Sequence, residues 1–380
     1  MDIRIRRASD LAEEAFKYLN KMQSGETPII KTGQNFIDDH LSGVLPSDCI
    51  IYSANSGVGK TKLLYDTLDS ILKEDVNKNA KDITTLEFQM EMKFLNRILR
   101  DTHTLTAKKK SEILTKAFTE EEKAVVKQYY ESLKDDRRYI CEESVTVGDF
   151  YTMTEEFCNE NKHKAAIWIA LDHVLLLKKS FPSEDTAETL TARINDLRKK
   201  FNNVYFILLT QMNRLMYSNV SERNNAMMPT TGMIYGSSHF EFLSSYIIAI
   251  IDPFKLGVNE FLKVNRDRYD WLEDFMTDED KNGKVSFNTL GNSFKFVLKT
   301  RESDMPYKNL YINKMNLSED NIKKMEQSVD KKTNSSSVPI FSVPTFEQTT
   351  TAEITPTSYA DLSKAFDAPV KKNEDDSEPF

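Results

Sequence analysis

Residues 49–61 read CIIYSANSGVGKT, and this segment carries the clearest structural signal in the chain. The mostly apolar run 49–53 predicts a buried strand, and the segment that begins at Thr61 predicts a helix. Between them, Ala54 to Thr61 spell the phosphate-binding loop A-N-S-G-V-G-K-T, with Ala54 in the place of the usual first glycine. Small residues allow successive backbone N–H groups to turn toward a phosphate, and the positive end of the following helix adds to the attraction. The pattern therefore predicts a nucleoside triphosphate site on a strand–loop–helix unit.

Each part of this loop has an expected task. We expect the loop backbone to surround the phosphates, the Lys60 ammonium to reach the β- and γ-phosphates, and the Thr61 hydroxyl to ligate Mg²⁺. The residues predicted to bind the nucleotide are Ser56, Gly57, Val58, Gly59, Lys60 and Thr61.

Two later strand ends carry polar residues that suit the same chemistry. Residues 165–177 read AAIWIALDHVLLL, which predicts a strand that ends at Asp172. A carboxylate at the carboxyl edge of a parallel sheet can hold Mg²⁺ together with Thr61, so both residues are predicted metal ligands. Gln211 follows the predicted strand 204–210, where an amide could sense the γ-phosphate. Taken alone, Gln211 is as often an ordinary residue at a strand end.

The rest of the chain alternates between apolar runs and helical patterns. The predicted strands are 49–53, 83–90, 138–141, 165–171, 204–210, 246–251 and 294–299, and the predicted helices lie at 9–23, 61–73, 106–136, 147–161 and 185–201. This alternation predicts an α/β fold, in which helices cover both faces of a mostly parallel, twisted sheet. Residues 255–290 interrupt the alternation with a charged segment, which we interpret as an insertion between late strands.

The composition limits the partners and the location of the protein. A formal charge of −8 excludes a uniformly basic surface, so any DNA contact has to come from a local patch. Cys49, Cys141 and Cys158 lack metal-ligand spacing, which favours reduced thiols. The charged N-terminus does not resemble a signal peptide, and no apolar run reaches the ~18–20 residues of a membrane span. We therefore expect a cytoplasmic protein without a membrane partner.

Several ordered stretches together resemble the ATPase domain of DnaB-type replicative helicases. They are SGETPIIKTG (24–33), SDCIIYSANSGVGKT (47–61), DHVLL (172–176), LTQMNR (209–214), GSSHFEFLSSYIIAI (236–250) and FVLKTR (296–301). The resemblance implies a RecA-like phosphate-loop ATPase that uses ATP and Mg²⁺. It also implies a hexameric motor that moves 5′→3′ on single-stranded DNA and unwinds duplex DNA in replication.

By the same resemblance, Lys299 and Arg301 match a Lys and an Arg that enter the ATP site of the neighbouring subunit. A guanidinium supplied from outside stabilises the charge that develops on the γ-phosphate, an effect worth ~10³–10⁵ in rate. Two loops would contact single-stranded DNA in the pore of the ring. One carries Lys178 and Lys179 and the other spans residues 215–232, although an exposed lysine pair is usually only solvated.

The family also has a glutamate that polarises the attacking water. It lies at the end of the strand that follows the helix of the phosphate-binding loop. Here the segment reads TTLEFQMEM, and straight alignment brings Gln89 to that position. Glu87 lies two residues earlier on the same face of the strand and Glu91 two residues later. We predict Glu87 as the base because only a carboxylate can accept a proton from water. Glu91 and Gln89 stay as alternatives.

The resemblance suggests three parts of the chain: a linker helix at 1–25, the ATPase domain at 26–327 and a disordered acidic tail at 328–380. Residues 331–380 contain five of the eleven prolines and no glycine, a composition that buries too little apolar surface to offset the entropy of ordering. The final residues KKNEDDSEPF resemble tails that recruit replication partners, although a solubilising role is the simpler interpretation.

Some features depart from the family and leave other functions open. Only about 23 residues precede the ATPase similarity, so the usual N-terminal domain that contacts primase is not seen, as in a phage-like protein. The helix at 9–23 could pack on an adjacent subunit or on its own domain. The alternatives to a helicase are a RecA-like recombinase, a helicase-loader ATPase, or a degenerate ATPase that serves as a scaffold.

Overall fold

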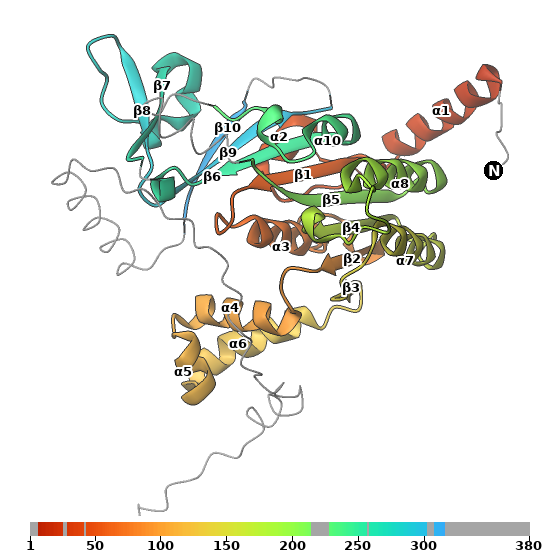
Figure 1. The fold of residues 1–380 in the computed structure, drawn as a ribbon, viewed down its shortest axis with the longest axis horizontal. Helices are drawn as coiled ribbons and strands as arrows, with labels where there is room; N and C mark the ends of the chain where they lie inside the picture. The colour runs from red at the N-terminus through yellow and green to blue at the C-terminus, as the bar shows by residue number, and fades with distance from the viewer. Residues whose placement is uncertain are drawn as a thin grey trace, which may run out of the picture. The chain divides into compact units, whose positions relative to one another are not determined.

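One mixed sheet of eight strands organises the fold. In the computed structural model, its order is β10-β9-β6-β1-β5-β4-β2-β3 (Figure 1). The six strands from β6 to β3 are parallel, whereas β9 and β10 pair antiparallel at one edge. The strands are β1 (Cys49–Ala54), β2 (Ile83–Gln89), β3 (Arg138–Cys141), β4 (Ala166–Asp172), β5 (Val204–Gln211), β6 (Tyr246–Ile251), β9 (Asn292–Lys299) and β10 (Leu310–Lys314).

The structure describes residues 7–25, 29–41, 43–213, 228–256, 258–301 and 308–315. The predicted tail at 328–380 and much of the second predicted DNA loop lie outside these residues. The described residues all belong to one of the two units of the chain, Met1–Val329.

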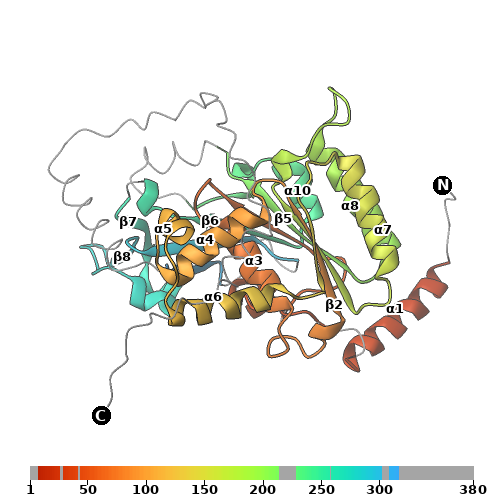
Figure 2. The same cartoon turned by 90° about the horizontal axis from the view of Figure 1, so that it is seen from below.

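Helices cover both faces of the sheet, as the continuous apolar strands predict. One face packs against α7 (Val147–Glu160), α8 (Thr186–Lys200) and α10 (Ser237–Leu243) through a core that includes Phe150, Ile194 and Phe240. The opposite face packs against α2 (Asn35–Leu41) and α3 (Lys60–Ile71) through Phe36 and Leu64, among others. Figure 2 shows the two layers on either side of the strands. The predicted α/β architecture with a mostly parallel sheet is confirmed.

A helical unit lies between β2 and β3 and consists of α4 (Phe94–Thr106), α5 (Lys110–Thr115) and α6 (Glu120–Leu133). The Thr119 hydroxyl accepts a hydrogen bond from Glu122 N, and the Glu122 carboxylate accepts one from Thr119 N, so a capping box begins α6. The first of these helices begins at Phe94, ahead of the predicted helical region. This unit lies close to α3 in both views (Figures 1 and 2).

The charged segment at 255–290 forms a small unit of its own. β7 (Glu260–Asn265) and β8 (Lys284–Asn288) pair antiparallel, and the turns of η5 (Arg266–Phe275) connect them. Phe261, Tyr269 and Phe287 are buried against Phe294 and Phe296 of β9. The insertion is therefore anchored to the antiparallel edge of the main sheet.

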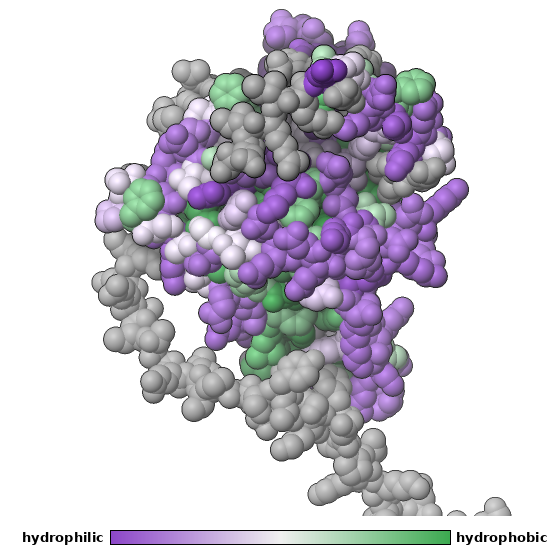
Figure 3. All heavy atoms as spheres, turned by 90° about the vertical axis from the view of Figure 1, so that its right-hand side faces the viewer, coloured by the Kyte–Doolittle hydropathy of each residue, from purple (hydrophilic) through white to green (hydrophobic). Residues whose placement is uncertain are grey.

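The N-terminal helix α1 (Ala8–Gln23) does not bury its apolar residues in this chain. Leu11, Phe16 and Leu19 are 47%, 66% and 54% exposed. The side of the molecule seen in Figure 3 is largely hydrophilic, with hydrophobic residues visible among the polar ones. The helix is predicted correctly, but Leu11, Phe16 and Leu19 remain largely exposed to solvent in the part of the chain that the structure describes. Within the same residues, no helix is both long and apolar enough to cross a membrane.

Candidate nucleotide-binding site

The phosphate-binding loop connects the end of β1 to the first turn of α3. Gly57 and Gly59 have φ angles of +76° and +108°, a region that side chains rarely adopt. A Cβ at either position would meet no atom within 4 Å, so glycine is required by the backbone and not by lack of space. Gly59 is also the N-cap of α3, and Lys60 is its first residue. The positive end of the helix therefore faces the loop.

Lys60 is fixed inside this loop. Its Nζ donates to Ala54 O at 2.9 Å and to Asn55 O at 3.4 Å, and the residue is 7% exposed. Burial lowers the pKa of Lys60, whereas the charges of Glu91 and Asp172 oppose that shift. The Lys60 ammonium thus lies at the centre of the loop and forms no salt bridge with a carboxylate among the described residues.

Asp172 ends β4 beside the loop and has the environment of a metal ligand. Burial raises the pKa of Asp172 to about 6 and the charge of Glu91 adds to this, while a hydrogen bond with Thr61 and the charge of Lys60 oppose it. Its Oδ1 is buried and has no hydrogen-bond partner in the part of the chain that the structure describes. An unpaired buried carboxylate oxygen next to a threonine hydroxyl fits a hard divalent cation. Thr61 and Asp172 are therefore compatible with Mg²⁺.

A cavity of about 660 Å³ opens in front of the loop. This is within the usual range for a small-molecule site. Its walls come from the loop, from α3 and from the helical unit, and they include Ser56, Gly57, Gly59, Lys60, Thr61, Tyr65, Glu91, Arg97, Arg100 and Asp101. The predicted loop residues other than Val58, which packs against the core, thus lie together on one side of a space that could hold a nucleotide.

Two further polar groups approach the loop from neighbouring strands. Gln211, at the end of β5, is the register partner of Ala54, so its strand ends beside the loop as predicted. Lys255, which follows β6, donates from Nζ to Gly57 O at 2.7 Å and lies 3.4 Å from the buried Asp252 carboxylate. Sequence reasoning did not identify Lys255, because nothing in the pattern around it points to the loop.

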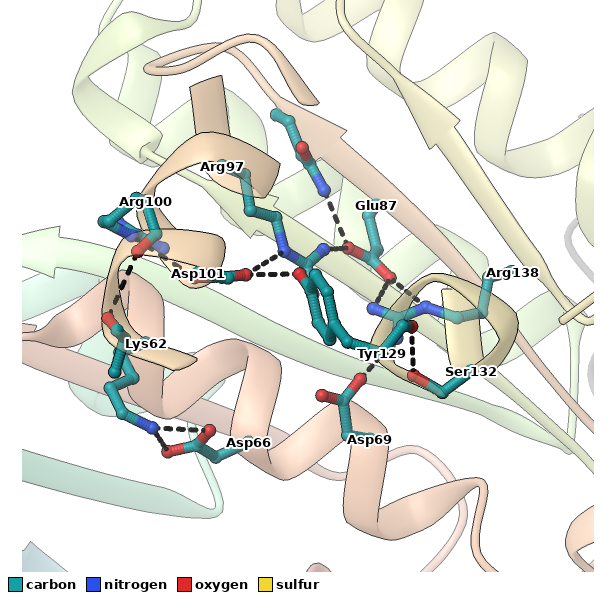
Figure 4. Close-up of polar contacts among 12 residues, drawn as sticks. Lys62, Asp66, Asp69, Glu87, Arg97, Arg100, Asp101, Tyr129, Ser132 and Arg138 are labelled. Atoms are coloured by element: carbon teal, nitrogen blue, oxygen red, sulfur yellow. Dashed lines mark hydrogen bonds and ion pairs between the residues drawn. The ribbon is translucent and has the colours of Figure 1, made fainter. Parts of the chain in front are cut away.

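The Glu87 carboxylate is already bound on both oxygens. Arg138 Nη2 donates to Oε1 at 2.7 Å, Gln89 Nε2 donates to Oε2 at 2.9 Å, and Arg97 Nη1 lies 3.5 Å from Oε2 (Figure 4). The Arg97 guanidinium also lies 3.3 Å from the centroid of the Tyr65 ring, on the loop helix. Burial alone would lower the pKa of Arg138, but the carboxylates of Glu87 and Asp69 raise it. The predicted base is thus part of a buried ion-pair cluster.

Glu91 occupies a different environment two residues after β2. It is exposed, lines the cavity beside Lys60 and Thr61, and lies near enough to Asp172 to raise the pKa of that carboxyl. Gln89, in contrast, is the register partner of Asp172 and is 2% exposed. Among the three alternatives, Glu91 is the carboxylate that lines the cavity.

Lys299 and Arg301 lie at the opposite edge of the sheet. Lys299 is the register partner of Ile247 near the start of β6, and its Nζ donates to Glu241 O. Arg301 Nη2 lies 2.5 Å from Oδ1 of Asp48, the residue that precedes β1. Because β9 is antiparallel to β6, its end reaches the amino edge of the parallel strands. The structure therefore separates this pair from the loop of its own chain.

The first predicted DNA loop follows the Asp172 strand. Lys178 and Lys179 are both exposed, and Lys178 N donates to Val145 O at 2.9 Å. Of the second predicted loop, residues 215–227 lie outside the described residues.

Comparison with known proteins agrees with this geometry. The family model described as DnaB-like helicase C terminal domain matches residues 29–250. Among solved structures, one described as an ATPase domain is similar with a TM-score of 0.55 and 15% identity, over 81% of this chain and 99% of that one. "The Structure Of A DnaB-Like Replicative Helicase And Its Interactions With Primase" is similar with a TM-score of 0.52 and 16% identity, over 82% of this chain and 64% of that one. Among curated proteins, no sequence matches this chain. The predicted RecA-like helicase fold is thus confirmed.

Proposed function

Because the chain belongs to the DnaB-like helicase C-terminal domain family, we propose that it is a motor ATPase of DNA replication. In this proposal it hydrolyses ATP to translocate 5′→3′ on single-stranded DNA and to unwind duplex DNA, as a ring of six subunits. Membership of this family supports a helicase that hydrolyses nucleotides. The DNA substrate, the direction and the ring of six are what we propose beyond it.

The main support for a shared site is the distance, within one chain, between the phosphate-binding loop and Arg301. Lys60 bonds to Ala54 at the end of β1, whereas Arg301 is bound to Asp48 just before that strand begins. Six strand residues at about 3.3 Å each separate the two by about 20 Å. An arginine side chain cannot span that length, so a complete site would need Arg301 from a second chain.

Hydrolysis would then use groups from two subunits. The loop N–H groups and Lys60 would bind the β- and γ-phosphates and hold them in one orientation. Thr61 and Asp172 would hold Mg²⁺, which neutralises charge on the phosphate oxygens when bound. Gln211 would respond to the γ-phosphate, and the partner's Lys299 and Arg301 would stabilise the charge that develops there.

The residue that accepts a proton from the attacking water has two candidates. Glu87 was predicted from the strand pattern, but its carboxylate already accepts from Arg138 and Gln89. We propose Glu91, because it lines the cavity beside Lys60 and is free of such a cluster among the described residues. Glu91 can reach the phosphates without dismantling buried ion pairs.

The exposed apolar residues of α1 support assembly. An amphipathic helix whose leucines remain about half exposed in a single chain has a surface to bury against another subunit. The pore loop with Lys178 and Lys179 would contact DNA phosphates. The acidic end of the tail would be available for a replication partner.

A mixing experiment tests the shared site. Arg301→Ala and Lys60→Ala should each lower DNA-stimulated ATP hydrolysis by ~10³-fold or more. Mixed together, the two inactive variants should regain activity, because a subunit with an intact loop then meets a subunit with an intact arginine. Arg193→Ala, an exposed arginine on α8, is the matched control and should keep wild-type hydrolysis.

Fork unwinding by the wild-type protein completes the test. A protein that hydrolyses ATP on DNA without opening a fork is the recombinase or loader alternative, and a protein without hydrolysis is the scaffold alternative. Mixtures that stay inactive would contradict a site shared between chains.

A further inference from the structure

Arg301 is held by two groups at the amino edge of the sheet, each at the start of a different strand. Its Nη2 lies 2.5 Å from Asp48 Oδ1 and 3.4 Å from Ser245 Oγ. Asp48 precedes β1 and Ser245 precedes β6, while Arg301 follows β9. Residues next to two strands of the core therefore hold a guanidinium that follows a third strand.

Asp48 is itself held rigidly. It is 0% exposed, its Oδ2 accepts from Leu45 N at 2.8 Å, and its Oδ1 accepts from the Ser245 hydroxyl. Ser245 N in turn donates to Cys49 O at 2.8 Å, so its backbone belongs to the sheet edge. The carboxylate that meets Arg301 is thus part of the core and not a mobile surface group.

The two partners differ sharply in burial. The Arg301 side chain is 44% exposed, whereas Asp48 is fully buried. The guanidinium therefore covers the buried carboxylate with one nitrogen and still reaches the surface of the chain. An arginine that acts on the nucleotide of another chain would have to extend from this surface.

We propose that Asp48 and Ser245 are positioning residues that aim Arg301 at the ATP site of the neighbouring subunit. The proposal rests on the shared site proposed above and adds the groups that orient its arginine. A free arginine has many rotamers to lose on ordering. Fixing Nη2 in advance removes much of that freedom and leaves the rest of the planar fork directed outward, which is how a preorganised donor contributes to rate.

The test is Asp48→Asn, which keeps the shape of the side chain and removes its charge. We expect kcat to fall about 10²-fold, the loss typical of a reacting group misplaced by about 1 Å. The Kd for ATP should stay within twofold, because Asp48 lies at the far end of β1 from its own loop. Ser245→Ala, which leaves both charges in place, should lower kcat in the same direction by a smaller factor.

Mixing separates positioning from a purely structural role. Mixed with Lys60→Ala, Asp48→Asn should regain activity, because the Lys60→Ala subunit supplies a correctly held arginine. Mixed with Arg301→Ala, it should not regain activity, since both variants damage the same side of the shared site. A variant that is merely misfolded would be rescued by neither partner.

Asp252→Asn is the matched control. Asp252 is also a buried carboxylate paired with an exposed cation, Lys255, but at the loop edge of the sheet. Its defect should follow the loop side, so it should be rescued by Arg301→Ala and not by Lys60→Ala. If Asp48→Asn behaves as Asp252→Asn does, or keeps wild-type kcat, the positioning role is wrong. If Arg301→Ala and Lys60→Ala fail to rescue each other, the shared site itself is wrong.

Discussion

Changing Glu87 to Gln removes one negative charge from a cluster that contains two buried guanidinium groups. Arg97 and Arg138 are 1% and 7% exposed and both contact this carboxylate. Breaking a buried ion pair by removing one partner lowers the free energy of unfolding by about 3–5 kcal/mol. In a domain of this size each kcal/mol lowers Tm by about 2–4 °C, so Glu87→Gln should unfold roughly 6–20 °C below wild type.

Glu91→Gln should behave in the opposite way. Glu91 is exposed, and surface substitutions usually change stability by less than about 0.5 kcal/mol. Losing a general base lowers kcat by ~10²–10⁴-fold, while ATP binding through the loop is retained. Thermal unfolding and single-turnover hydrolysis of both variants, with the exposed Glu121→Gln as control, measure the two effects separately.

The pair of results can refute the reasoning. If Glu87→Gln unfolds at the wild-type temperature and loses hydrolysis while Glu91→Gln stays active, then Glu87 is the base. The ion-pair cluster would then be no obstacle to catalysis, and the geometric argument for Glu91 would be wrong.

Other contacts lead to three more predictions. Lys255→Met should weaken ATP binding about 10–100-fold in calorimetry, because it removes a charge-assisted hydrogen bond to Gly57 of the loop, and an unchanged Kd would mean that the contact has no part in binding. Thr61→Val should raise the Mg²⁺ concentration needed for half-maximal hydrolysis, with little change in Tm, while a Mg²⁺ titration that matches wild type would remove Thr61 from the metal site. Deleting residues 330–380 should leave Tm and hydrolysis unchanged, because the residues of all three core clusters lie between Ile30 and Ile312. A protein that no longer folds would contradict the boundary of the domain.

The strands of the parallel sheet and the starts of some helices could be predicted, because buried strands and helix caps leave local signals in the sequence. Residues 49–52 are apolar and, together with Ser53, are fully buried in β1, and the capping box of Thr119 and Glu122 is a local signal for the start of α6. The small unit around β7 and β8 was predicted only as an interruption. Its core forms by packing of side chains from β7, η5, β8 and β9, and such tertiary packing leaves no local pattern in the sequence.

The site shows the same division between local and distant information. The loop from Ser56 to Thr61 is one continuous motif, so its residues could be predicted together. The roles of Glu87 and Glu91 depend instead on Arg138 and Arg97, which lie on other elements and engage only one of the two carboxylates. Side-chain alternation along a strand indicates which residues share a face, but not which one is already paired.

The direction of β9 is the structural basis of the shared site proposed above. Lys299 and Arg301 can be read from the sequence as the end of a late strand, and parallel pairing would bring that end to the edge where Lys60 lies. An arginine could then serve the nucleotide of its own chain. Antiparallel pairing with β6 sends the same residues to the start of β1, where Asp48 binds Arg301. The reversed direction of β9, which lies between β10 and β6, thus separates the arginine from its own loop by about 20 Å, so the role proposed for Arg301 above would need a second chain.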